Sequence, residues 1–126
     1  MNIIIKTVPH RHQRYETVGD YFTIGELDTI LVSKMGNPDY EFLVAIHELT
    51  EMYLCQKRGI SESSITAFDI KFEKARKPGN LDEPGDDPKA PYRDEHCIAT
   101  AVERLVCGVL GVSWKEYEKA VNKLYK

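Results

Sequence analysis

The sequence predicts an α+β domain, in which a small antiparallel sheet of one strand and a hairpin packs on a central helix backed by two C-terminal helices. Short β-branched segments fill the first quarter of the chain, and one long segment with helical periodicity follows them. Two more helical segments lie beyond a stretch rich in proline and aspartate. The length of 126 residues suits one domain, and we expect residues 1–126 to form it.

The strand signals come first. Ile3–Val8 is short and rich in β-branched residues, so we expect a buried strand that Pro9 ends. Residues 20–24 and 29–33 flank the turn-like segment 25–28, and this arrangement predicts a β-hairpin. The mixed, mostly polar residues between the first strand and the hairpin predict a loop.

Residues 39–58 carry the clearest helical signal. An apolar stripe recurs there at spacings of three and four residues, and a stripe of this kind typically faces the core. Its members are Phe42, Ile46, Leu49 and Tyr53, widened by Leu43, Thr50 and Leu54. Gly59 stands where a left-handed residue commonly ends a helix. Four consecutive apolar residues near the start of the segment indicate a central position in the fold.

A long connection follows the central helix. Residues 61–88 predict an irregular segment, and a connection of this length is usually functional or mobile. Within it, residues 65–72 are compatible with either a short helix or a strand. Its end and the residues that follow are punctuated by four prolines: Pro78, Pro84, Pro88 and Pro91.

Two helices are expected after this connection. The first begins near Pro91, which suits the first turn of a helix, and runs to about Leu110. Ser113 and Glu116 have the spacing of a capping box, which predicts a last helix that ends near Tyr125.

Composition and charge argue against several kinds of partner. The chain has 17 Lys and Arg residues against 20 Asp and Glu residues, a net charge of −3, so it has no general attraction for nucleic acid or for an anionic membrane. No segment approaches the roughly 20 apolar residues that a membrane-spanning helix requires. The three cysteines form neither a CxxC pair nor an even set, which indicates a reduced, cytoplasmic protein.

The central helix carries the main candidate for chemistry, the pentad His47-Glu48-Leu49-Thr50-Glu51. His47 and Glu51 are four residues apart and share one helix face, so an imidazole nitrogen and a carboxylate oxygen can reach the same divalent ion. Glu48 points about 100° further round the helix, where it can reach a metal-bound water. A metal hydrolase needs these two ligands and this adjacent base. The alternative is a face of solvated acids with His47 hydrogen-bonded at the edge of the core.

This pentad resembles the helix of the zincin metallopeptidases, which carries the motif His-Glu-x-x-His. The resemblance covers the hairpin, the helix after it and a later helix, roughly half of the chain. It implies that His47 is the first ligand and that Glu48 is the general base. Glu51 stands where the family has its second histidine.

In the thermolysin-like branch of that family, the ligands are two histidines and one glutamate. The same set forms here if Glu51 supplies the carboxylate and His96 the second imidazole. The resemblance therefore implies a zincin-like fold with Zn²⁺ as cofactor, although the same ligands suit Fe²⁺ or another divalent transition metal.

Other residues of the sequence are also potential ligands. Glu103 lies seven residues after His96 and shares its helix face, so it is expected to bind the ion, to hold a ligand in place, or to pair with Arg104. Cys55 is either a thiolate ligand or, more naturally, a small buried side chain. Two pairs of polar residues are expected to be solvated at the surface, although the first pair could also approach the site: Asp86 with Asp87, and His10 with His12.

Two classes of function follow. In the first, His47, Glu51 and His96 hold the ion and leave a position for water, and Glu48 takes a proton during hydrolysis of a peptide or amide bond in a peptide or protein substrate. In the second, the chain is a non-catalytic binding or assembly module, and any ion only ties two helices together. Glu103 in the open position would favour the module, and an exposed cleft along residues 29–33 would favour the peptidase.

The stretch from Glu83 to Pro88, together with the Ala90-Pro91-Tyr92 and Glu95-His96 segments, also resembles small phage or prophage proteins. That resemblance indicates neither a mechanism nor an activity that could be assayed. It is compatible with either class of function.

Overall fold

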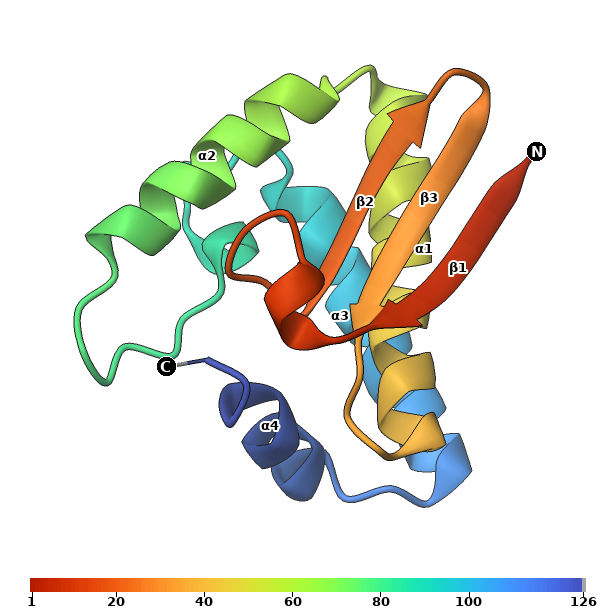
Figure 1. The fold of residues 1–126 in the computed structure, drawn as a ribbon, viewed down its shortest axis with the longest axis vertical. Coiled ribbons are helices and arrows are strands. Elements are labelled where there is room, and N and C mark those ends of the chain that lie inside the picture. The colour runs from red at the N-terminus through yellow and green to blue at the C-terminus, as the bar shows by residue number, and fades with distance from the viewer. Residues whose placement is uncertain (126) are drawn as a thin grey trace.

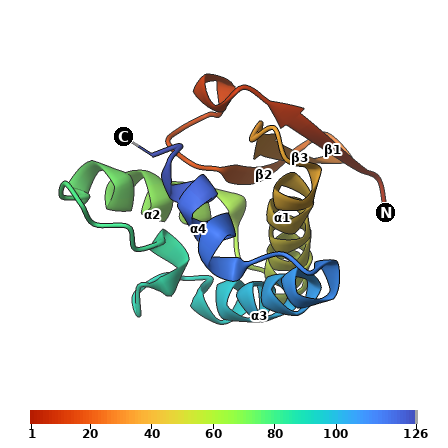
Figure 2. The ribbon, with the colours of Figure 1, turned by 90° about the horizontal axis from the view of Figure 1, so that it is seen from below.

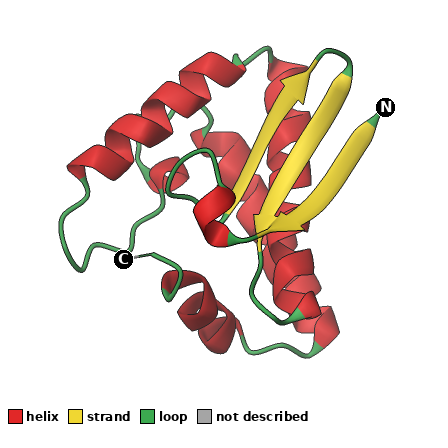
Figure 3. Ribbon diagram, in the orientation of Figure 1, coloured by secondary structure: helices red, strands yellow, loops and turns green. Residues whose placement is uncertain are grey.

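The computed structural model describes residues 1–125 and shows three strands followed by four helices (Figure 1; Figure 3). The elements are β1 (Ile3–Val8), β2 (Gly19–Ile24), β3 (Leu27–Ser33), α1 (Pro38–Arg58), α2 (Glu62–Ala75), α3 (Arg93–Leu110) and α4 (Trp114–Asn122), with 3₁₀ turns at His10–His12 and Pro84–Asp86. The sheet lies over one side of α1, and α3 lies along the other side (Figure 2). The α+β class is therefore confirmed.

The sheet is mixed, which corrects the expectation of an antiparallel one. The hairpin strands β2 and β3 pair in antiparallel fashion, whereas β1 pairs in parallel with β3. The strand order β1-β3-β2 places β3 in the middle, because its run of apolar residues can be buried on both faces. Residues 29–33 are thus paired on both edges, and no extended peptide can pair along them.

The first strand lies at an edge, so the expectation that it is buried is wrong. Ile4 and Ile5 are exposed, and only Ile3 and Val8 are partly covered. A β-branched run predicts a strand but does not distinguish a central strand from an edge strand, because that depends on pairing with residues far along the chain.

The ends of α1 lie within one residue of the limits expected from the sequence. The Asn37 side chain accepts hydrogen bonds from the backbone N–H groups of Asp39 and Tyr40, and Gly59 ends the helix with φ = 73°. These contacts satisfy backbone groups that the helix itself leaves unpaired.

The orientation of α1 differs from the expected one. Phe42 remains 50% exposed, whereas its neighbour Leu43 is fully buried. The buried face carries Leu43, Val44, His47, Glu51, Met52 and Cys55. The helix therefore turns the candidate ligands His47 and Glu51 inward, toward α3.

The helices α2, α3 and α4 can be compared with the segments expected after the central helix. Residues 65–72, which suited either a helix or a strand, lie in α2, whose first turn is capped by the Ser61 hydroxyl. The expectation of an irregular segment over residues 61–88 is therefore wrong for residues 62–75. Tyr92 is the N-cap of α3, so Pro91 lies just before the first turn and not within it. The Ser113 hydroxyl accepts from the Glu116 N–H at 3.3 Å, as a capping box requires, but α4 ends at Asn122.

Two apolar clusters fill the interior. The larger one joins the sheet to α1, α3 and α4 and includes Ile30, Val32, Leu43, Met52, Cys107 and Tyr117. The smaller one lies under α2 and contains Cys55, Ile65, Ala90 and Tyr92.

Among residues 1–125, no single helix is long and apolar enough to cross a membrane; only the bent pair α3 and α4, taken together, meets the requirements of length and composition.

The orientation of α1 can be tested with two neighbouring substitutions. Leu43→Ala should lower the free energy of unfolding by about 2–5 kcal/mol, because it opens a cavity in the core. Phe42→Ala should cost clearly less, since half of that side chain already faces solvent. Urea unfolding of both variants is the measurement. Equal losses would mean that Phe42 is packed in the core as deeply as Leu43, which would contradict this orientation.

Candidate metal centre

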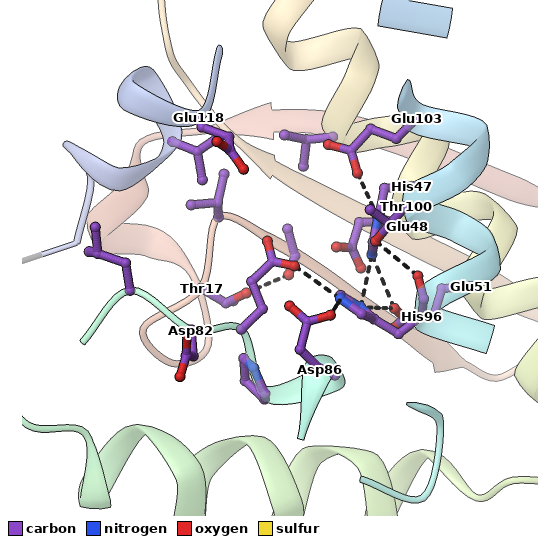
Figure 4. Close-up of a pocket in the computed structure, with 18 of the residues that line it drawn as sticks. Thr17, His47, Glu48, Glu51, Asp82, Asp86, His96, Thr100, Glu103 and Glu118 are labelled. Atoms are coloured by element: carbon purple, nitrogen blue, oxygen red, sulfur yellow. Dashed lines mark hydrogen bonds and ion pairs between the residues drawn. The ribbon is translucent and has the colours of Figure 1, made fainter. Parts of the chain in front are cut away.

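Three side chains from two helices meet where α1 packs against α3. His47 and Glu51 occupy successive turns of α1, and His96 lies in the first turn of α3. Glu51 Oε2 lies 3.1 Å from His47 Nε2 and 2.9 Å from His96 Nδ1, and the two ring nitrogens are 3.2 Å apart. Figure 4 shows these three side chains pointing toward one another. The structure thus brings together all three residues that the sequence suggested as ligands.

The size of this triangle suits a transition-metal ion. Zn²⁺ binds imidazole nitrogen and carboxylate oxygen at about 2.0–2.1 Å, so tetrahedral ligands lie about 3.3–3.4 Å apart. The three donor atoms are 2.9–3.2 Å apart and need to separate by only a few tenths of an ångström. All three side chains are buried, which limits their freedom to turn away.

Each candidate ligand on α1 is also held at its other polar atom. His47 Nδ1 lies 2.8 Å from Glu103 Oε1, and the Tyr117 hydroxyl donates to Glu103 Oε2 at 2.5 Å. The Tyr21 hydroxyl donates to Glu51 Oε1 at 2.9 Å. Outer contacts of this kind fix the orientation of metal ligands and tune their basicity.

Of the three roles expected for Glu103, the structure therefore favours the one that holds a ligand. Its carboxylate contacts the far nitrogen of His47 and does not enter the triangle. Arg104 packs over the Trp114 ring instead, with its guanidinium carbon 4.5 Å from the ring centre. The open side of the triangle is thus not filled by Glu103.

His96 is positioned from several directions. Its neighbour Glu95 is buried and pairs with Arg58 Nη1 at 2.9 Å, which joins the first turn of α3 to the last turn of α1. The turn at Pro84–Asp86 closes over the ring, because a Cβ atom on Gly85 would overlap the His96 imidazole. On this side, His96 Nε2 lies 3.0 Å from Glu83 Oε2 and 3.3 Å from Asp86 Oδ1.

Glu48 lies beside the triangle, in the same cavity of about 500 Å³ as the three candidate ligands (Figure 4). Its side chain passes over Gly19 of β2, where a Cβ atom would come within 2.6 Å of Glu48 Oε1. Burial, with help from the negative charge of Glu51, raises the pKa of the Glu48 carboxyl well above its ordinary value. Glu48, the candidate general base, therefore lines the same cavity as the three candidate ligands. Its pKa is sensitive to charges placed nearby.

The electrostatics of the triangle favour positive charge. Burial alone would raise the pKa of Glu51, but hydrogen bonds from His47 and His96 lower it to about 2. Burial alone would lower the pKa of His96, but contacts with Glu51 and Glu83 raise it to about 10. The pKa of His47 is also raised well above its ordinary value, because its bonds to Glu103 and Glu51 outweigh burial. A divalent cation would compete with the protons on these two rings.

The other candidates lie elsewhere. Cys55 is a buried thiol in the smaller apolar cluster, and burial raises its pKa to about 11, so it is a packing residue. His12 is exposed as expected, but His10 is partly buried and lies 2.9 Å from Ser33 Oγ, which corrects its expected solvation. The Asp87 side chain accepts from the Lys89 N–H and does not approach His96.

Several contributors to the site were missed in the sequence. They are Tyr21, Glu83 and Tyr117, which contact the ligands or their partners, and Gly19 and Gly85, which leave room for the site. Tyr21 and Tyr117 lie in segments that the sequence predicts as a strand and a helix, but nothing in those segments links them to the site. For Glu83 and Gly85 the signal is the Pro-Gly-Asp segment, which marks a turn but not what the turn covers.

Comparison with protein-family models, with curated proteins and with solved structures finds no match for this chain. The resemblance to zincins therefore rests on His47, Glu48 and their spacing. Function is inferred from the geometry of the site.

The closure of the Pro84–Asp86 turn over His96 can be tested at Gly85. Gly85→Ala should lower the free energy of unfolding by about 1–3 kcal/mol, because the added methyl group overlaps a buried ring. Gly108→Ala is the matched control: its Cβ atom would meet nothing within 4 Å, and alanine should stabilise α3 by about 0.5–1 kcal/mol. Thermal or urea unfolding is the measurement. An unchanged stability of Gly85→Ala would show that the turn is not packed on the ring.

Proposed function

We propose that this protein is a zincin-like metal-binding protein, in which His47 Nε2, Glu51 Oε2 and His96 Nδ1 hold one divalent ion, and that it hydrolyses peptide or amide bonds. The observation that carries this proposal is the meeting of three buried donor atoms at near-tetrahedral separations. Two imidazoles and one carboxylate suit Zn²⁺ best and also suit Fe²⁺.

The charge balance of the triangle supports a cation there. Without an ion, contacts with carboxylates raise the pKa of both His47 and His96 and so favour positive charge on two rings whose facing nitrogens are 3.2 Å apart. Like charges at that distance repel in a buried site. One divalent ion would replace both protons and bind all three donors.

When bound, the ion would bring the pKa of a coordinated water to about 7 and polarise the carbonyl of a substrate. Glu48 would accept the proton of the attacking water and return it to the leaving amine. A positive charge in the triangle would lower the raised pKa of Glu48 and so favour its basic form. Gly19 leaves the space in which this carboxylate moves.

The place for a substrate is the cavity and not the central strand. Its volume of about 500 Å³ can hold a few residues of a peptide. Pairing along residues 29–33 is blocked because β3 has neighbours on both edges. At the free edge of β2, the Thr23 N–H is already bonded to Glu62 Oε2. Recognition would therefore depend on side chains more than on strand pairing.

One observation favours the second candidate function, a non-catalytic binding or assembly module of the phage type. The ligands join the two longest helices and are all buried, as they would be if the ion only tied α1 to α3. Glu48 distinguishes the two functions, because a structural ion needs no adjacent base.

A conservative change at Glu48 tests catalysis. Glu48→Gln keeps the shape of the side chain and removes the base, so the variant should keep its metal and its fold while hydrolysis falls by about 10²–10⁴-fold. Cleavage of a peptide and amide library, assayed with both proteins, is the measurement. If the wild type cleaves nothing above the Glu48→Gln background, the module is the correct function.

Metal-dependent stability tests the three ligands. The protein should gain about 2.7 kcal/mol of stability when the free ion is at 100 times its Kd, because the unfolded chain has no preformed site. His96→Ala should remove this gain while it leaves the pentad on α1 intact. Thermal melts with Zn²⁺ and with chelator decide it, and an undiminished gain in His96→Ala would exclude His96 as a ligand.

As the pH rises, the stability of the metal-free protein should fall, whereas the affinity for metal should increase. In the metal-free protein, the raised pKa of His96 contributes stability that is fully present below about pH 6.5 and is lost as the pH rises toward 10. Metal binding strengthens over this range, because protons no longer compete. The difference between the loaded and the chelated protein should therefore grow from pH 6.5 to pH 9. A difference that shrinks would contradict the site.

A further inference from the structure

A second group of potential ligands lies on the far side of the His96 ring. The triangle uses Nδ1, whereas Glu83 Oε2 and Asp86 Oδ1 lie 3.0 Å and 3.3 Å from Nε2. One donor atom from each of these three residues lies within 4.8 Å of the other two. Figure 4 shows Asp86 directed at the ring of His96.

Two carboxylates lie close to His96 Nε2, but this nitrogen carries at most one N–H donor. His96 is only 5% exposed, and its Nε2 atom is shielded from solvent and makes no hydrogen bond of acceptable geometry. A single N–H donates well to one carboxylate, so the other carboxylate has only solvent to balance its charge. Two carboxylates that converge on one buried nitrogen are better satisfied by a cation of higher charge.

The turn that carries these carboxylates is fixed in place. Gly85 packs against the imidazole ring, and the Arg93 guanidinium donates to the Asp86 carbonyl at 2.5 Å. The Asp86 N–H also donates to the Glu83 carbonyl, which closes the turn. Glu83 and Asp86 thus approach His96 from an anchored segment.

We propose that His96 Nε2, Glu83 and Asp86 form a second divalent-cation site, so that His96 can bind one ion through each ring nitrogen. This rests on the proposed function for the ion at Nδ1. When the second ion binds, Nε2 gives its proton to the solvent, and the resulting imidazolate bridges the two ions. One nitrogen and two carboxylates suit Zn²⁺ or Cu²⁺.

The second site should bind more weakly than the triangle. The side chains of Glu83 and Asp86 are 53% and 56% exposed, so an ion there keeps water ligands and exchanges with solvent. It also lacks the outer contacts that orient His47 and Glu51. We therefore expect two binding steps of different affinity.

Stoichiometry is the first test. Protein stripped of metal is titrated with Zn²⁺ by calorimetry, and bound zinc is measured after equilibrium dialysis at each concentration. The wild type should bind two ions per chain. The double variant Glu83→Gln/Asp86→Asn should bind only one zinc ion in the same concentration range. Its affinity for the second ion should fall by more than the ~10–100-fold that is typical when an outer contact of a ligand is removed.

A matched control removes the same charge from the same segment. Asp82→Asn/Asp87→Asn changes two carboxylates that do not contact His96, and it should keep both ions. If this control loses the second ion as fully as Glu83→Gln/Asp86→Asn does, general charge and not a site attracts it, and the proposal is overturned.

Copper reports the bridge itself. With Cu²⁺ in both positions, the two unpaired electrons should couple through the imidazolate, so the low-temperature paramagnetic resonance signal integrates to clearly less than two copper ions. Glu83→Gln/Asp86→Asn should give the full signal of one. Two uncoupled copper ions in the wild type would overturn the proposal.

The outcomes separate this proposal from the proposed function. A single zinc ion in the wild type, bound about 10–100-fold more weakly in Glu83→Gln/Asp86→Asn, would mean that both carboxylates only orient His96; that outcome overturns the second site and leaves the first. Two ions in the double variant would also overturn it. No ion in the wild type would overturn both.

Discussion

The structure depends on the burial of one carboxylate. Glu51 lies on the inner face of α1, between two imidazoles and a tyrosine hydroxyl, and its charge must be balanced there. Removing the partners of a buried charge costs about 3–5 kcal/mol, so the packing of α1 on α3 requires His47 and His96 close to this oxygen. The same three converging donor atoms could also be balanced by one shared cation, which is the basis of the proposed metal site.

The rest of the fold is arranged around this point. The strand β2 supplies Tyr21, α4 supplies Tyr117, and the loop before α3 supplies Glu83. Two glycines let these parts approach, one under Glu48 and one against the ring of His96. Because separate elements contribute one contact each, an ion bound at the proposed site would couple to the packing of the domain and should act on global stability and not on one helix alone.

Local features could be predicted from the sequence. The limits of α1 follow from Asn37 and Gly59, and the shared face of His47 and Glu51 follows from a spacing of four residues. The orientation of α1 could not be predicted, because Phe42 and Tyr53 form as regular a stripe as the buried residues do. The sheet covers one side of this helix and α3 another, so periodicity alone does not identify the inner face.

Long-range features were beyond the sequence for a different reason. The parallel pairing of β1 and the contacts of Tyr21, Glu83 and Tyr117 join segments with no shared pattern. The pKa of His96 follows from the carboxylates that surround it in space. His96 could be identified as a candidate ligand only by residue type, whereas its position opposite Glu51 required the tertiary structure.

The most direct test of the account is the metal content of the protein itself. Protein purified without an affinity tag, supplied with zinc and then dialysed against metal-free buffer, should retain close to one transition-metal ion per chain by elemental analysis. His47→Ala should retain essentially none, whereas His12→Ala, which changes an exposed histidine, should match the wild type. A wild type without bound metal, or His47→Ala with its full complement, would contradict the metal centre.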